Sequence, residues 1–144
     1  MENSLIEQFD KARYNMNKWL TIGWAVWDGS YILKDLIINR LIILVLVFIG
    51  LIGWILFSIH LIKLLRLSKK INANHKLKEA LTNEMIRFNS YKSFCIGFWT
   101  FLVTIVCFLV VSVFYDLSAL LVCRITLYLG VLSFFTAWLI YNRK

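Results

Sequence analysis

The sequence predicts an all-α integral membrane protein, a helical bundle with three transmembrane helices. Three long apolar runs support this: Leu41–Ile62 and Ser93–Tyr115 carry no formal charge over 22 and 23 residues, and Ile125–Asn142 adds 18 more. A helix needs about 20 apolar residues to cross the roughly 30 Å hydrocarbon core. Hydrophobic residues make up 60% of the chain, above the roughly 45–50% of soluble domains. We therefore expect a single membrane domain over residues 1–144.

The three spans are expected at 41–66, 93–115 and 119–141. The short turn Asp116-Leu117-Ser118 makes the last two an antiparallel hairpin, and either Asp116 or Ser118 is a suitable helix cap. The chain contains no proline, which fits uninterrupted helices and argues against the broken helices of transporter substrate sites. Gly50 and Gly53 lack the G-x-x-x-G dimer spacing, yet they permit the close approach of another helix.

Residues 1–40 form an N-terminal segment whose relation to the membrane is ambiguous. Only Asp28 is charged between Trp19 and Leu33, a stretch too short to span comfortably. One helical face of this stretch gathers large side chains: Leu20, Trp24, Trp27 and Tyr31. Because tryptophan and tyrosine favour the headgroup level, we interpret residues 19–38 as an interfacial or re-entrant helix. The alternative is a fourth span, which would bury charged residues at about 2.5–3.5 kcal/mol each.

A basic linker at 67–92 separates the first span from the second. Residues 63–92 carry eight Lys or Arg against two Glu, whereas residues 1–40 balance to zero. Apolar residues in the linker recur with helical spacing, at Leu77, Leu81, Met85 and Phe88. This pattern predicts a cytoplasmic amphipathic helix that begins near Asn72 or Asn74.

The positive-inside rule orients the chain, because this linker is short and adjoins two spans. The linker and the C-terminus should face the cytoplasm. With three spans the N-terminus lies outside, and with four it lies inside. Anionic lipid headgroups are then the natural partner of the linker, and no nucleic-acid partner is expected.

The residues expected to contact lipid or a partner protein are the linker charges and one charge within a span. They are Lys69, Lys70, Lys76, Lys78, Glu84, Arg87 and Arg124. Arg124 is only six residues beyond Ser118, about 9 Å at 1.5 Å per residue. We expect it to reach the outer headgroups or to pair with Asp116, with a contact to a partner protein or a role in binding an ion or substrate as alternatives.

No catalytic, cofactor-binding or metal-binding motif is found, so enzyme function is not expected. His60 has one companion, His75, too few ligands for a metal, and a polar contact near the membrane interface is its expected role. Asp28 either points to water from an interfacial helix or faces a substrate or proton pathway. The three cysteines, Cys95, Cys107 and Cys123, all lie in apolar runs and predict buried thiols without disulfides.

The leading functional hypothesis is a non-catalytic accessory, assembly or scaffold component of a larger inner-membrane complex. An oligomeric transporter, channel or holin-like pore is the first alternative, supported only by a weak polar stripe of Thr100, Thr104 and Ser112, which Cys107 joins. A membrane immunity protein against a pore-forming toxin is the second. A basic linker containing Glu84-x-x-Arg87, followed by a membrane hairpin, resembles many small bacterial inner-membrane proteins. That resemblance implies a multi-pass location in such a membrane and no activity.

Overall fold

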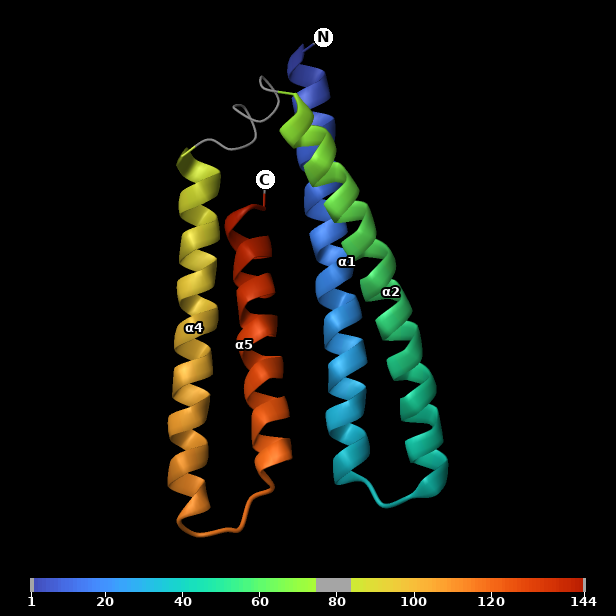
Figure 1. Ribbon diagram of the computed structural model, residues 1–144, viewed down its shortest axis with the longest axis vertical. Helices are drawn as coiled ribbons and strands as arrows, with labels where there is room; N and C mark the ends of the chain where they lie inside the picture. The colour runs from blue at the N-terminus through green and yellow to red at the C-terminus, as the bar shows by residue number, and fades with distance from the viewer. Residues whose placement is uncertain (1, 75–83, 144) are drawn as a thin grey trace.

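The computed structural model describes residues 2–74 and 84–143, which form helices and no strand (Figure 1). The helices are α1 (Glu2–Leu36), α2 (Arg40–Ala73), α4 (Glu84–Ser112) and α5 (Ala119–Tyr141). Three of them, α2, α4 and α5, are long and apolar enough to cross a membrane. The predicted all-α class and its three apolar helices are therefore confirmed.

Two of these helices extend beyond the expected spans on the side of the basic linker. The helix α2 continues to Ala73 instead of residue 66, α4 begins at Glu84 instead of residue 93 and ends at Ser112, and α5 has the expected bounds. The described parts of the linker therefore belong to α2 and α4 and form no helix of their own. Asn74 caps the end of α2, where its N–H donates to Ile71 O at 3.2 Å. Residues 75–83 lie outside the described residues.

The first hairpin pairs α1 with α2 through glycines. A Cβ atom at Gly53 would lie 2.5 Å from the backbone nitrogen of Trp27, and one at Gly23 would lie 2.7 Å from that of Phe57. Side chains larger than hydrogen would therefore push the two backbones apart. At the turn, the Asn39 side chain accepts a hydrogen bond from Leu41 N–H at 3.0 Å and caps α2.

The register of this hairpin decides where residues 19–38 lie. Because Trp27 is beside Gly53 and Gly23 is beside Phe57, the segment runs antiparallel along the apolar part of α2. The sequence-based interpretation as an interfacial helix differs from this arrangement, in which residues 19–36 are the second half of one continuous helix. The physical reason is the close backbone contact at the glycines, which exists only after α1 and α2 have paired.

In the second hairpin, α4 and α5 also approach each other closely at glycines. A Cβ atom at Gly97 would lie 2.8 Å from Phe134 Cβ and 3.0 Å from Gly130 O. Toward the chain end, Asn89 Nδ2 donates to Tyr141 O at 3.0 Å. Ser118 is the N-cap residue of α5, as expected from its position, although its side chain makes no capping hydrogen bond.

The two hairpins lie side by side in the order α4, α5, α1, α2, and α1 contacts α5 (Figure 1). We call the end that holds both chain termini, Asn74 and Glu84 the terminal end, and the end that holds the turns 37–39 and 113–118 the turn end. The N-terminus and the C-terminus thus share one end of the molecule. The three-span prediction placed them on opposite sides, because it did not pair α1 with α2.

Buried residues are few, as is usual for helices solvated by lipid. Leu20 and Ser93 are the largest fully buried side chains among those described. The outer helices α2 and α4 expose large apolar groups, including Phe48 at 61% and Trp99 at 64%. Such faces are unfavourable in water and compatible with acyl chains. At the terminal end, Leu67 and Ile71 of α2 form a small apolar cluster with α1 residues, among them Phe9 and Met16.

Candidate functional site

Polar side chains join the two hairpins at the turn end. Arg124 Nη1 of α5 donates to Asp35 Oδ2 of α1, and Lys34 Nζ lies 3.8 Å from Asp35 Oδ1. We call Lys34, Asp35 and Arg124 the turn-end cluster. Its side chains are about one-third exposed, since Asp35 keeps 27% and Arg124 38% of its accessible surface. Within residues 2–74 and 84–143, the Arg124–Asp35 contact of this cluster is the ion pair that joins α1 to α5.

This pairing differs from what the sequence suggested for Arg124. Asp116 is exposed and forms no ion pair within the part of the chain that the structure describes. The guanidinium instead reaches a carboxylate 89 residues away in sequence, on a helix expected to be interfacial. The sequence carried one signal for this arrangement: Asp28 and Asp35 are seven residues apart and so share one face of α1.

Asp28 occupies an unusual position, half-buried on α1 beside the middle of the apolar run of α2. Its neighbour Trp27 lies against Gly53, the middle of the run Leu41–Ile62. Arg124 is near enough to interact with the Asp28 carboxylate electrostatically, but the guanidinium is already engaged by Asp35. Within residues 2–74 and 84–143, Asp28 itself makes no hydrogen bond or ion pair. If α1 crosses the membrane with α2, this carboxylate lies at a depth where ionisable groups are costly and commonly functional.

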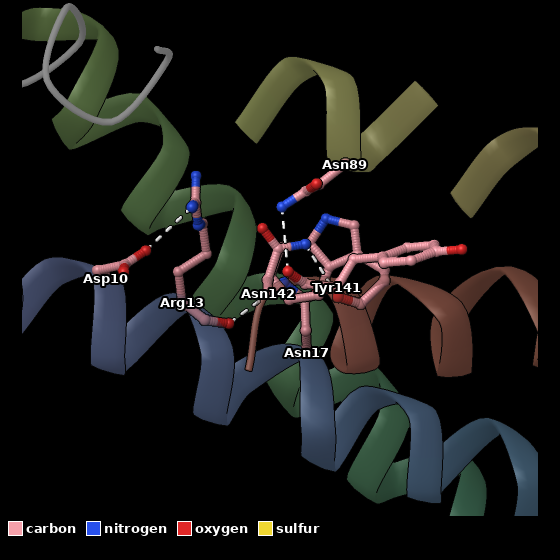
Figure 2. A network of polar contacts seen from close by, with 7 residues as sticks. Asp10, Arg13, Asn17, Asn89, Tyr141 and Asn142 are labelled. Carbon is pink, nitrogen blue, oxygen red and sulfur yellow. Dashed lines mark hydrogen bonds and ion pairs between the residues drawn. The ribbon is translucent and has the colours of Figure 1, made fainter. Parts of the chain in front are cut away.

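A second polar group, which we call the terminal-end cluster, surrounds Arg13 (Figure 2). Arg13 Nη2 donates to Asp10 Oδ1 at 3.0 Å, and its guanidinium stands over the Trp138 ring of α5 at 5.8 Å from the centroid. Asn17 Nδ2 donates to Arg13 O at 3.1 Å, and Asn142 Nδ2 donates to Trp138 O at 2.9 Å. Arginine on an aromatic face contributes about 0.5–1 kcal/mol at exposed sites and more when desolvated. The cluster therefore ties α1 to the last turn of α5.

A cavity of about 310 Å³ opens beside this cluster, lined by all four helices. Its apolar wall comes mainly from α5 and α2, with Phe134, Trp138 and Leu64. Its polar wall contains Arg13, Asn17, Ser68, Asn72 and Ser90. The cavity is thus amphiphilic, and it was not foreseen because its walls come from segments distant in sequence.

The fold does not bring together the site residues that were proposed from the sequence. Lys69, Lys70, Glu84 and Arg87 are exposed on α2 and α4 at the terminal end. Glu84 and Arg87 form no ion pair within the described ranges. Lys76 and Lys78 lie outside the described residues. The sequence missed Arg13 and Asp35, whose roles depend on contacts with α5.

Several other polar side chains of the apolar helices form hydrogen bonds to backbone carbonyl groups of their own helix. Thr100, Thr104 and Ser112 donate their hydroxyls to the backbone carbonyls of Ile96, Thr100 and Leu109. His60 Nδ1 lies 2.9 Å from Leu56 O, and the centroid of its ring lies 6.0 Å from that of the Trp19 ring, on which it stacks.

Of the thiols, Cys95 is half-buried while Cys107 and Cys123 are exposed, contrary to the expectation of buried cysteines. No group of three His, Cys, Asp or Glu residues is placed for a metal ion in the described part of the chain.

The chain was compared with models of known protein families, with curated proteins and with solved structures, and none of them matches it.

Proposed function

We propose that this protein is a non-catalytic, multi-pass membrane protein that serves as an accessory, assembly or scaffold component of a larger inner-membrane complex. The observation that carries the proposal is Asp28, a half-buried carboxylate beside the middle of α2 that has no ion pair or hydrogen bond of its own among residues 2–74 and 84–143. Intramembrane carboxylates normally pair with another polar group. A donor or cation from a partner membrane protein would supply that pair.

The helix arrangement supports the same proposal. A row of four helices leaves α2 and α4 covered on one side only, so broad faces remain for lipid or for helices of another protein (Figure 1). Among the hydroxyls of α4, Thr100, Thr104 and Ser112 are already used by the helix backbone. They offer a poor lining for a water-filled path, which disfavours the pore alternative.

Substitution of Asp28 tests the proposal. Asp28→Ala should remove a co-purifying membrane protein, while protein abundance stays normal because Asp28 has no pairing interaction of its own to lose. The measurement is blue-native electrophoresis of gently solubilised membranes, followed by identification of the co-migrating chains. Asp116→Ala is the matched control, since it removes an exposed carboxylate at the turn end and should leave the complex intact.

Two outcomes would contradict this function. One is migration of the unaltered protein only as a small monomer. The other is ion or proton flux through liposomes that contain the purified protein alone, abolished by Asp28→Asn, which would favour the transporter alternative.

The proposed topology has four crossings, with both termini in the cytoplasm. Of the described residues, 2–18, 63–74, 84–92 and 143 lie at the terminal end and carry ten of the thirteen described Lys and Arg residues, while Lys34, Arg40 and Arg124 lie elsewhere. In the three-span arrangement Lys11, Arg13 and Lys18 would lie outside and the cytoplasmic side would hold only seven of these thirteen, so the four-crossing topology gives the stronger positive-inside asymmetry. In the three-span alternative, α1 would have to leave its contacts with α2 and lie along the outer surface.

Single-cysteine labelling distinguishes these topologies in a background with Cys95, Cys107 and Cys123 replaced by serine. Gln8→Cys and Ser68→Cys should react from the cytoplasmic side, and Ile38→Cys, 95% exposed at the turn, from the opposite side. Labelling of Gln8→Cys together with Ile38→Cys from the outside would instead establish the three-span topology.

A further inference from the structure

We propose that the cavity between the two hairpins binds one anionic phospholipid from the leaflet at the terminal end. The cavity measures about 310 Å³ and is bounded by α1, α2, α4 and α5. It is separate from Asp28, which lies beside the middle of α2. The inference therefore does not depend on the identity of a protein partner.

The first argument is the depth of the cavity. Its α5 wall, at Phe134, lies against Gly97 of α4, four residues inside the apolar run that begins at Ser93. Its outermost α2 residue, Asn72, lies ten residues beyond the end of the run Leu41–Ile62. At 1.5 Å per residue these positions are about 6 Å inside and about 15 Å outside the apolar boundary. The cavity therefore crosses the level at which a phospholipid changes from acyl chain to headgroup.

The second argument is that the cavity has both an apolar and a polar wall. Phe134, Phe135 and Trp138 of α5 line one side, and Arg13, Ser68 and Asn72 of α1 and α2 supply polar groups to the other. A purely polar ligand would leave the aromatic wall uncovered, and a purely apolar one would desolvate the arginine. An amphiphile with an apolar chain and a charged head matches both walls.

The third argument is charge, which selects an anionic headgroup. Arg13 is held in place by Asp10 at 3.0 Å and by the Trp138 ring, so little side-chain entropy is lost when it binds a ligand. Asp10 offsets part of its charge, but the described residues 63–74 and 84–92 add six basic side chains against one acidic one at the same end. Basic pockets between transmembrane helices on the cytoplasmic side are known to bind anionic headgroups.

The fourth argument is the supply of hydrogen-bond donors. The side chains of Ser68, Asn72 and Ser90 line the cavity and make no hydrogen bond within the described ranges 2–74 and 84–143. Phosphate oxygens are acceptors only, so hydroxyl, amide and guanidinium donors complement them. These donors come from α2 and α4, and a bound phosphate would bridge the two hairpins.

The test uses the full-length protein in nanodiscs or detergent, with phosphatidylglycerol and phosphatidylcholine as probes in native mass spectrometry. One phosphatidylglycerol should remain bound at a lipid concentration that leaves phosphatidylcholine unbound. Arg13→Gln should weaken phosphatidylglycerol binding about five- to tenfold, near the 1 kcal/mol expected for one basic residue. Lys11→Gln is the matched control, because Lys11 is 75% exposed on the same helix and pairs with Glu7. It should have little effect.

A second variant tests the cavity itself without changing any charge. Ser90→Phe fills the space between the hairpins and should abolish retention of phosphatidylglycerol while the protein stays folded in thermal unfolding. If Lys11→Gln and Arg13→Gln weakened phosphatidylglycerol binding equally, the lipid would be held by general attraction to the basic surface, and the proposal would be overturned. So would undiminished binding in Ser90→Phe. Binding of soluble glycerol phosphate as tight as that of phosphatidylglycerol would also overturn it, because the acyl chain would then have no role.

Discussion

Leucine in place of Gly53 is expected to prevent stable pairing of α1 with α2. Even the first side-chain carbon at this position would lie 2.5 Å from the Trp27 nitrogen and 3.0 Å from its Cα. Both atoms belong to the backbone, so no rotamer change relieves the contact. Overpacking of a tight contact costs about 1–3 kcal/mol, and we expect Gly53→Ala to fall in this range and Gly53→Leu beyond it. Thermal unfolding of the purified protein in detergent measures the loss.

Two controls make this result specific to the helix contact. Val45→Ile adds a methylene on the exposed side of the same helix, where the residue keeps 53% of its surface, and should leave the unfolding temperature unchanged. Gly23→Ala should resemble Gly53→Ala, because a Cβ at Gly23 would lie 3.1 Å from Gly53 O. The double variant should then cost less than the sum of the two, since one separation of the helices relieves both clashes. Full stability of Gly53→Leu would show that α1 does not pair with α2 in this register.

Reversal of one charge in the turn-end cluster is expected to separate the hairpins at that end. Arg124→Glu places a carboxylate against Asp35, where the native pair has an attractive contact. The side chains are partly exposed, so the pair itself contributes on the order of 1 kcal/mol, and the reversal adds like-charge repulsion to that loss. The double variant Asp35→Arg with Arg124→Glu should recover most of the stability. The measurement is a double-mutant cycle on thermal unfolding, read together with cross-linking between α1 and α5.

Asp116 gives the decisive comparison for this prediction. If Arg124 depended on Asp116, as its nearness in sequence suggests, Asp116→Asn would destabilise the protein as much as Asp35→Asn does. The structure leads us to expect a loss only for Asp35→Asn. Arg124→Lys keeps the charge without the planar fork and should show an intermediate effect. Equal tolerance of every one of these variants would mean that Arg124 simply reaches the headgroups.

The apolar helices could be predicted because their signal is local. A run such as Leu41–Ile62 specifies a helix and its surroundings by length and composition alone. The bounds of α5 followed in the same way from the turn before it and the polar residues after it. The sequence left the ends of α2 and α4 at the linker open because a basic amphipathic continuation of a helix has the same periodicity as a separate helix. In both cases the pattern specifies the helical face and leaves open where one helix ends.

The sequence by itself determined that the chain is helical, that it enters the membrane and that its basic residues gather near the linker. Only the tertiary structure decided that α1 lies beside α2, which places both termini at one end and puts Asp35 within reach of Arg124. The sequence could not show this, because Gly23 lowers helix propensity locally and becomes favourable only when Gly53 faces it from another helix. Likewise, the cost of Asp28 in an apolar segment argued against insertion. In the proposed four-crossing topology the packing of α1 against α2 and α5 offsets that cost, and this packing depends on residues far away in sequence.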